Sequence, residues 1–177
     1  MGIIKEHPPV QLFAAITFNE RVDLKEVFAH LQNLCGAIEE RSALFDFDAF
    51  TDYYESEMGS GLEKLFITFK ELIHPETLPD IKRQTNQIEL EISKSKQRCV
   101  NIDPGYLTVS KVVLATTKDY AHRLYLGKGI YGDLHLVYQK KSFRIQPWTY
   151  PDYRQPLAIE FFNRLRETYR DKLEHGK

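Results

Sequence analysis

The chain has 177 residues, of which 42% are hydrophobic and 28% charged, with a formal net charge of −1. These values are typical of a soluble domain that can bury a core without disulfides or a structural metal. They exclude a whole-molecule field that would hold the protein on nucleic acid or on an anionic membrane. We expect one cytoplasmic domain over residues 1–177, because no apolar run is long enough to span a bilayer.

The first predicted element is a buried strand over the mostly apolar run Val10–Phe18. Asp23 and Glu26 have the spacing of a capping box, and they predict the start of a helix. Gly36 follows the last apolar position of that helix and predicts its end.

The next segments predict strands over residues 38–47 and 62–72, separated by an ordered polar and aromatic loop over 48–61. Residues 75–93 predict a helix and residues 98–102 a short strand. The order βαββαβ is that of a ferredoxin-like core.

The remaining chain predicts antiparallel strands over residues 110–116, 122–126, 130–138 and 142–146. It closes with a helix over residues 156–174, whose apolar positions recur every four residues. We therefore predict an α+β fold, with a ferredoxin-like βαββαβ core extended by C-terminal antiparallel strands and a closing helix.

Charge is unevenly distributed along the chain. Residues 20–63 contain 11 acidic and 3 basic residues, whereas residues 98–154 contain 4 acidic and 9 basic residues and seven of the ten tyrosines. This asymmetry fits two solvated faces, or a basic, tyrosine-rich surface that binds an anionic ligand. The sequence leaves open whether the two regions face one cleft.

The run Gly127-Lys128-Gly129-Ile130-Tyr131-Gly132 matches G-x-G-x-x-G. A strand pattern follows it instead of a helix, which excludes a dinucleotide-binding fingerprint. The residues that follow contain none of the other protein-kinase motifs, so a kinase is also excluded. The run predicts a tight turn with positive φ, and the alternative is that its N–H groups and Lys128 hold a phosphate.

The run Asn101-Ile102-Asp103-Pro104-Gly105-Tyr106 predicts a strand that ends in a Pro-Gly turn. Asp103 would then stand at the strand end, where a carboxylate can act as a general base or bind a metal.

Several polar residues of the second half are candidates for one anion-binding site. Asp103 and His122 are the candidate acid/base residues, and Arg123 is the candidate charge clamp. The other candidate ligand-binding residues are basic, hydroxyl-bearing, aromatic or acidic: Lys111, Thr117, Lys118, Lys128, Tyr106, Tyr131, Trp148, Tyr150 and Asp152.

Two loops rich in aromatic and acidic residues lie at 50–59 and 148–153. Such loops either pack on each other or form the walls of a pocket. Asp52 and Glu57 could then join Asp103 as ligands of a metal ion such as Mg²⁺.

Five segments together resemble the bacterial family catalogued as domain of unknown function 4416. They are Asp52-Tyr53-Tyr54 with Glu57-Met58-Gly59, the run 101–108, Ala115-Thr116-Thr117-Lys118, His122-Arg123-Leu124-Tyr125 and the run 148–153. The resemblance covers nearly the whole chain and implies a bacterial, cytoplasmic setting. Members of that family often carry a GTP-binding label, but this sequence contains no G-x-x-x-x-G-K-[ST] phosphate loop to support it.

Three hypotheses for function follow. The first is a site for an anionic, phosphorylated small molecule or nucleotide, with or without catalysis. The second is an RNA-binding module, in which sheet aromatics stack on bases beside basic side chains. The third is a protein-interaction or assembly domain whose aromatic loops are buried against a partner.

Overall fold

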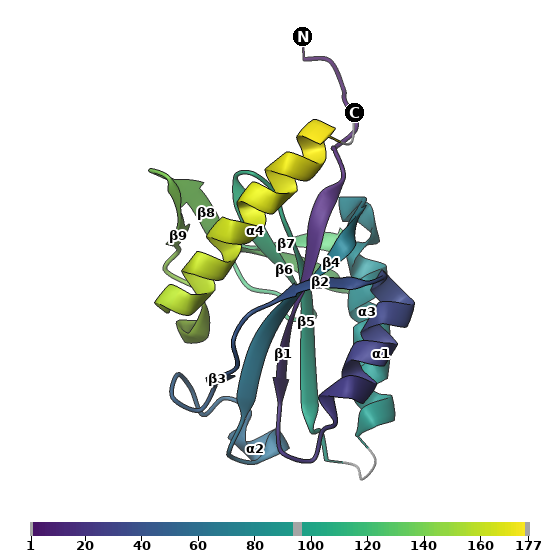
Figure 1. Cartoon of the computed structure of the whole chain (residues 1–177), viewed down its shortest axis with the longest axis vertical. Helices are drawn as coiled ribbons and strands as arrows, with labels where there is room; N and C mark the ends of the chain where they lie inside the picture. The colour runs from purple at the N-terminus through teal and green to yellow at the C-terminus, as the bar shows by residue number, and fades with distance from the viewer. Residues whose placement is uncertain (1, 94–96, 176–177) are drawn as a thin grey trace.

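The computed structural model describes residues 2–93 and 97–175, and its centre is a nine-stranded antiparallel sheet (Figure 1). The strands follow the order β2-β4-β1-β5-β6-β8-β7, with β3 paired to β4 and β9 to β8. The strands are β1 (Val10–Phe18), β2 (Ile38–Arg41), β3 (Phe45–Asp46), β4 (Glu63–Ile73), β5 (Val100–Leu107), β6 (Lys111–Thr116), β7 (Arg123–Gly127), β8 (Ile130–Gln139) and β9 (Ser142–Ile145). The helices are α1 (Leu24–Cys35), α2 (Glu55–Met58), α3 (Leu78–Ile92) and α4 (Pro156–His175), with short 3₁₀ turns at Pro75–Thr77 and Pro151–Tyr153.

Strand β1 is buried along its whole length, as its apolar sequence predicts. Its residues alternate between two cores, so that Leu12 and Ile16 face one and Phe13 and Ala15 face the other. One strand therefore supports the packing on both faces of the sheet.

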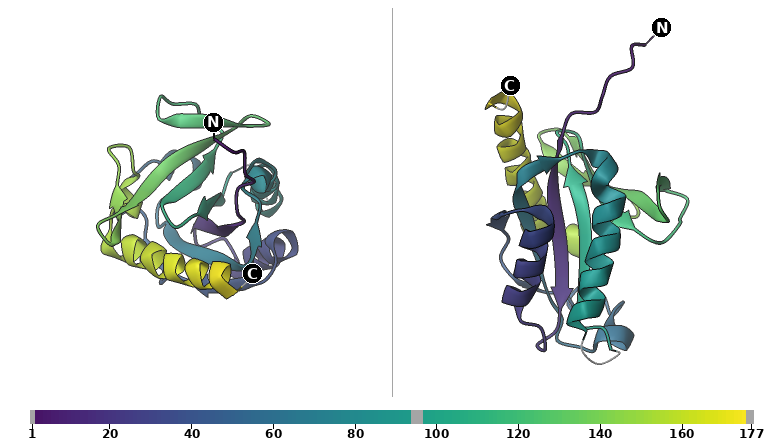
Figure 2. Two further views of the ribbon diagram at one scale, coloured as in Figure 1. Left: turned by 90° about the horizontal axis from the view of Figure 1, so that it is seen from above. Right: turned by 90° about the vertical axis from the view of Figure 1, so that its right-hand side faces the viewer.

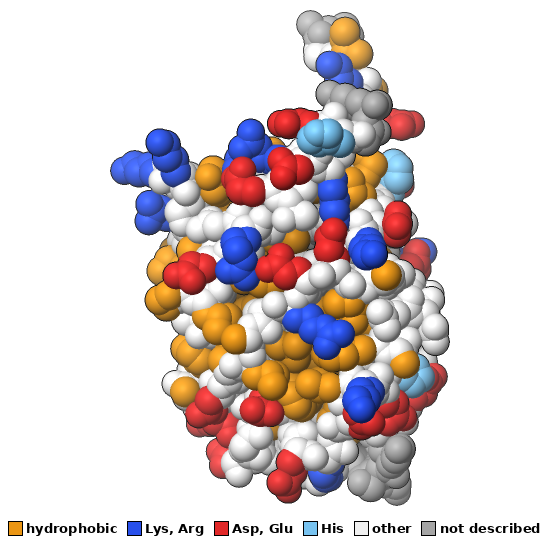
Figure 3. All heavy atoms as spheres, viewed as in Figure 1, with side chains coloured by type: hydrophobic (Ala, Val, Ile, Leu, Met, Phe, Trp, Pro, Cys, Tyr) orange, Lys and Arg blue, Asp and Glu red, His pale blue; other side chains and the backbone are white. Residues whose placement is uncertain are grey.

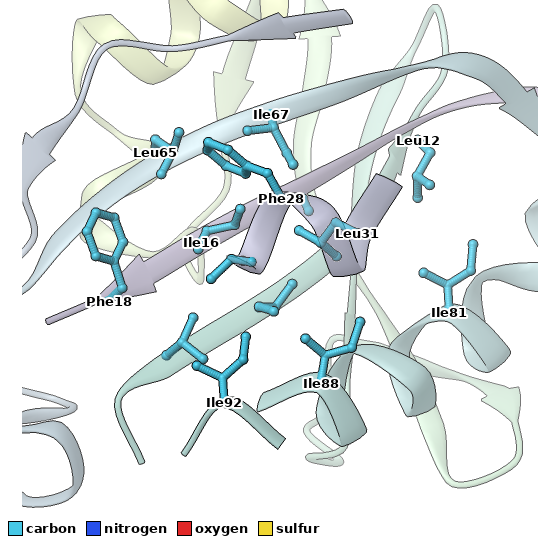
Figure 4. Packing of buried hydrophobic residues seen from close by; sticks show 14 of the residues in the cluster. Leu12, Ile16, Phe18, Phe28, Leu31, Leu65, Ile67, Ile81, Ile88 and Ile92 are labelled. Carbon is cyan, nitrogen blue, oxygen red and sulfur yellow. The ribbon is translucent and has the colours of Figure 1, made fainter. Parts of the chain in front are cut away.

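Helices α1 and α3 cover one face of the sheet and build the first core (Figure 4). The Asp23 carboxylate accepts a hydrogen bond from the Lys25 N–H at 2.9 Å and caps α1, and Gly36 ends that helix with φ 86°. In α3 an apolar stripe of Leu78, Ile81, Thr85, Ile88 and Ile92 is buried.

Helix α4 covers the opposite face and builds the second core (Figures 1 and 2). Phe161 and Phe162 pack on Phe66 of β4 with ring centroids 5.6 and 5.3 Å apart. On the outside, acidic and basic side chains are mixed over the upper part of this face, above a group of hydrophobic side chains (Figure 3). Arg164 and Lys172 pair with Glu40 and Glu39 of β2.

The sheet splits between β5 and β6. The two strands pair only at residues 105–107 of β5 and 112–114 of β6. Beyond that point residues 100–104 of β5 pair with β1 alone, while Ala115 and Thr116 of β6 pair with β8. A gap in the backbone ladder therefore opens at this end of β5.

Side chains of α3 take the place of the missing strand. The Ile102 N–H donates to the Glu89 carboxylate at 2.6 Å, and the Ile102 carbonyl accepts from Lys82 Nζ at 2.9 Å. Buried backbone groups must be hydrogen-bonded, which gives a reason for a buried lysine and a buried glutamate on the sheet side of α3.

The turn predicted at Pro104-Gly105 is wrong, because both residues lie inside β5. Alternation along an antiparallel strand turns the Pro104 nitrogen the same way as the Ile102 N–H, away from β1, so proline removes no ladder bond. At Gly105 a Cβ would lie 2.5 Å from the Phe13 ring and from the Val113 carbonyl oxygen. Glycine is needed there because β5 and β6 come together at that residue.

Other departures from the prediction are smaller. The predicted strand 38–47 is broken into β2 and β3, and the loop 48–61 contains the one-turn helix α2. The turns at Lys128 and at Lys140-Lys141 have positive φ. No described helix has the length and apolar character needed to cross a membrane.

Candidate functional site

A cavity of about 560 Å³ lies where β5 and β6 separate. Its walls come from β4, β5, β6, α3 and the three loops that contain α2, residues 117–122 and the 3₁₀ turn Pro151–Tyr153. The acidic first-half loop and the basic second half of the chain therefore share one cleft. This volume is in the range of ligand pockets.

A partly buried and a fully buried ion pair form part of the wall. Lys82 Nζ lies 2.8 Å from Asp103 Oδ1, and Lys64 Nζ lies 2.7 Å from Asp152 Oδ2. Burial acts to raise the pKa of Asp103, but the adjacent Lys82 ammonium outweighs it and holds that pKa below its ordinary value. The Asp103 carboxylate is therefore charged at neutral pH.

A third ionic group joins α3 to the start of β5. Arg98 pairs with Glu89 at 2.8 Å and with Glu57 at 3.1 Å, and it also donates to the Asn101 side chain. Burial raises the pKa of Glu89 despite the nearby Lys82 and Arg98. Every acidic residue that lines the cavity thus has a basic partner from the same wall.

Behind the wall, Asp133 of β8 is fully buried and contacts three basic side chains. Its Oδ2 lies 2.9 Å from Arg123 Nε and 3.3 Å from His122 Nε2, and its Oδ1 lies 3.2 Å from His135 Nδ1. Burial acts to raise the pKa of Asp133, but the hydrogen bonds from His135 and Arg123 lower it below its ordinary value.

His135 is held as a neutral imidazole. Its Nε2 accepts from the Tyr150 N–H at 3.1 Å, so Nδ1 carries the proton that faces Asp133. Burial lowers the pKa of His135. The net negative charge of Asp133 is therefore compensated mainly by Arg123.

Arg123 is buried, and its guanidinium group forms its hydrogen bonds with other groups of the protein. Besides Asp133, it donates to the Lys118 carbonyl at 2.9 Å and to the Tyr150 hydroxyl at 2.8 Å. Burial raises the pKa of Tyr150 to about 12, which keeps that hydroxyl protonated. Arg123 lines the cavity, but its main role is to hold the two loops beside it in place.

His122 is fixed on the cavity wall by stacking and by one hydrogen bond. Its ring lies parallel to Trp148 at a centroid distance of 4.8 Å and to Tyr120 at 6.1 Å. Because Nε2 contacts Asp133, Nδ1 is the ring nitrogen left for the cavity. This geometry suits a hydrogen bond or a proton transfer to a bound molecule.

Lys118 differs from the other cations of the cavity. Among the described residues, no carboxylate lies within ion-pair distance of its ammonium group, which instead lies 4.6 Å from the centre of the Tyr53 ring. Lys118 and Tyr53 come from opposite loops. Their contact spans the two walls and leaves the lysine charge available.

The structure brings together nine of the residues singled out from the sequence. They all line the cavity: Glu57, Asp103, Thr117, Lys118, His122, Arg123, Trp148, Tyr150 and Asp152. Asp103 lies inside β5 and not at a strand end, so its position was wrongly predicted.

Five predicted residues are not among those that line the cavity. Lys128 pairs with Asp80 at 2.6 Å on the surface, and Tyr131 packs on Tyr125 of the same hairpin. Lys111 begins β6 at the paired end of that strand, and Tyr106 packs against the first core.

Asp52, the fifth, is exposed on the loop before α2. It therefore does not join Glu57 and Asp103 in the predicted metal site, and those two carboxylates are bound to Arg98 and Lys82. Across residues 2–93 and 97–175, no three histidine, cysteine or acidic side chains are grouped to hold a metal ion.

The residues that α3 and β4 contribute to the cavity were not predicted from the sequence. Lys82 and Glu89 stand seven residues apart beside the apolar stripe of α3, and Lys64 directly precedes the apolar run of β4. Charged residues at such positions need buried partners, and that signal could have identified all three.

Comparison with known proteins places the chain in a family. The family model described as Domain of unknown function (DUF4416) matches residues 8–169, so the chain belongs to that family. Neither the curated proteins nor the solved structures contain a match.

Proposed function

We propose that this DUF4416 member binds a small anionic organic molecule, such as a phosphorylated metabolite or nucleotide, in the cavity between β5 and β6. The observation that carries the proposal is Lys118. Each acidic side chain that lines the cavity has a basic partner, with Glu57 and Glu89 sharing Arg98, whereas Lys118 has no acidic partner in the described part of the chain. Lys118 therefore offers a bound anion a positive charge with which no described carboxylate is paired.

His122 supplies a second contact for the anion. Its Nδ1, which the contact of Nε2 with Asp133 leaves unused, can donate to an anionic oxygen when the ring is protonated. When the ring is neutral, the same nitrogen can accept a proton from a ligand hydroxyl. Catalysis by His122 is therefore compatible with the proposal, with Asp133 as the positioning residue.

The class of ligand follows from the size of the cavity and from the side chains that line it. A lone phosphate fills little of about 560 Å³, and the aromatic side chains of Tyr53, Tyr54 and Trp148 can contact apolar or planar groups. The Asp103 and Asp152 carboxylates can accept hydrogen bonds from ligand hydroxyl or amino groups. An organic anion that carries hydroxyl groups satisfies all three features.

A thermal-shift screen of the purified chain against nucleotides and phosphorylated metabolites tests the proposal. A ligand at about 100 times its dissociation constant stabilises a protein by about 2.7 kcal/mol. Lys118→Ala should weaken the best ligand by about ten- to a hundredfold, the value of a charge-assisted hydrogen bond of about 1.5–3 kcal/mol.

Lys128→Ala is the matched control, because Lys128 belongs to the glycine-rich turn outside the cavity. It should leave the affinity unchanged. Either a screen in which no anion shifts the melting temperature, or a Lys118→Ala variant that binds as the wild type does, would overturn the proposal.

The fold interpretation that accompanies this proposal is a ferredoxin-like core over the first two thirds of the chain. The strand order β2-β4-β1-β5, with α1 and α3 on one face, supports it. Strands β6 to β9 would then be an extension that creates the split and the cavity. A solved structure of a second family member that keeps the four strands and varies the extension would test this division.

A further inference from the structure

We propose that β7 is a docking edge at which a second copy of this chain adds its own β7, antiparallel and about a twofold axis. The inference does not depend on the cavity or on its ligand. It comes from the difference between the two edges of the sheet.

The edge formed by β2 is protected. This strand has four residues, three of them charged, and α4 covers it through the ion pairs of Arg164 with Glu40 and of Lys172 with Glu39. Short length, charge and a covering helix are the ordinary means by which proteins prevent edge-to-edge pairing.

The edge formed by β7 is also short and is irregular between Tyr125 and Gly127, but it lacks the charged side chains and the covering helix that protect β2. The sheet order ends at β7, and β8 is its neighbour on the inner side. Leu124 is 75% exposed and Tyr125 63%, and Leu126 is also exposed. The one charged side chain of the strand, Arg123, is turned inward onto Asp133.

Neither helix layer covers β7. The strand lies at the rim of the molecule, on the side away from α4, and its hairpin stands out from the body (Figure 2). Leu124 pairs with Gly132 of β8, so no side chain of that neighbour shields it. The free edge is thus accompanied by an uncovered apolar surface.

The sequence of β7 favours a second copy as the occupant. Leu124, Tyr125 and Leu126 read the same in both directions around Tyr125. In an antiparallel pair centred there, Tyr125 faces Tyr125 of the other copy and Leu124 faces Leu126. Arg123 falls opposite the end of the strand at Gly127, beyond the irregularity between Tyr125 and Gly127, so no like charges oppose each other across the axis.

The interface would be small. One five-residue strand and its side chains bury less than the roughly 800 Å² per partner of a standard stable complex. We therefore expect a reversible dimer that dissociates at micromolar concentration and is well populated at submillimolar concentration.

Analytical ultracentrifugation of the full chain over that concentration range tests the proposal, with two charge variants at the central residue. Tyr125→Lys and Tyr125→Glu each place like charges face to face, so each variant should remain monomeric. An equimolar mixture should recover a dimer, because opposite charges then face each other. Leu44→Lys, at a side chain that is 48% exposed beside the other edge, is the control and should dimerise as the wild type does.

Circular dichroism and melting temperature establish that each variant is folded. Leu124→Lys is the second disruptive variant should the replacements at Tyr125 disturb the contact of that side chain with Tyr131. A wild type that stays monomeric throughout, or charge variants that dimerise alone, would overturn the proposal. Failure of the mixture to associate would overturn the twofold register centred on Tyr125.

Discussion

The backbone groups of the two halves of β5 find their hydrogen-bond partners in different ways. Residues 105–107 pair with β6 by an ordinary ladder, whereas at Ile102 the side chains of Lys82 and Glu89 hold the outward backbone groups. The paired half is stabilised by apolar packing, and the unpaired half by buried charges. The comparison shows how a sheet can open a polar cavity without leaving buried backbone groups unsatisfied.

The largest effect is expected at the unpaired half. Lys82→Met removes the partner of Asp103 and of the Ile102 carbonyl while keeping the length of the side chain. The free energy of unfolding should fall by about 3 kcal/mol, the lower end of the cost of breaking a buried ion pair, because Asp103 is partly exposed. Urea denaturation measures it. Lys128→Met, which breaks an exposed pair, should cost about 1 kcal/mol or less, and an equal loss in both variants would contradict the comparison.

The paired half should be most sensitive at the point where the strands meet. Gly105→Ala forces a methyl group against the Phe13 ring and the Val113 backbone oxygen, and should cost about 1–3 kcal/mol. Gly132→Ala is the control, since its new methyl group would meet only the flexible Leu126 side chain at 3.2 Å. Equal melting temperatures for the two variants would mean that the close approach at Gly105 is unimportant.

A third effect concerns the pH dependence of stability. Burial lowers the pKa of His135 below its ordinary 6.5, so the unfolded chain takes up a proton before the folded one does. The stability from neutral His135 is present above pH 6.5 and is lost as the pH falls from there through the folded pKa. The slope should reach about 1.4 kcal/mol per pH unit.

His135→Gln should flatten this slope in denaturation curves recorded between neutral and mildly acidic pH. His7→Gln, in the exposed N-terminal segment, should leave it unchanged. A slope that persists in His135→Gln would assign the pH dependence to another group.

The smallest effect on stability is expected at Lys118. Its ammonium group contacts only the exposed Tyr53 ring among the described side chains, so Lys118→Ala should change the free energy of unfolding by no more than about 0.5 kcal/mol. A calorimetric melting curve checks this. A loss comparable to that of Lys82→Met would show that Lys118 is structural and would remove the reason for assigning it to a ligand.

The same comparison explains what could be predicted from the sequence. Strand β1 and helix α1 were confirmed at their predicted bounds, because apolar periodicity and local caps determine such elements. The Pro-Gly pair was wrongly predicted as a turn. Local preference favours a turn there. In the fold, however, no strand pairs with the outer side of Pro104, and Phe13 and Val113 lie close to Gly105. These contacts depend on the tertiary structure and cannot be predicted from local sequence.

The candidate site was predictable in part for a similar reason. Residues from the loops 117–123 and 148–152 could be grouped by composition, and they do line one cavity. Lys64 and Lys82 reach it from elements distant in sequence, and Lys128 was included only because it lies in a glycine-rich motif. Which charges are already paired is visible only in three dimensions.

The most direct test of the cavity as an anion site is a titration of the ¹⁵N-labelled chain with the best ligand of the screen, followed by amide chemical shifts. We predict that the perturbed amides cluster at Thr117, Lys118 and His122, with further changes at Asp103 across the split. Perturbations centred on the turn at Lys128 and Gly129, with none at Lys118, would contradict the account. They would indicate instead that the glycine-rich turn binds the phosphate.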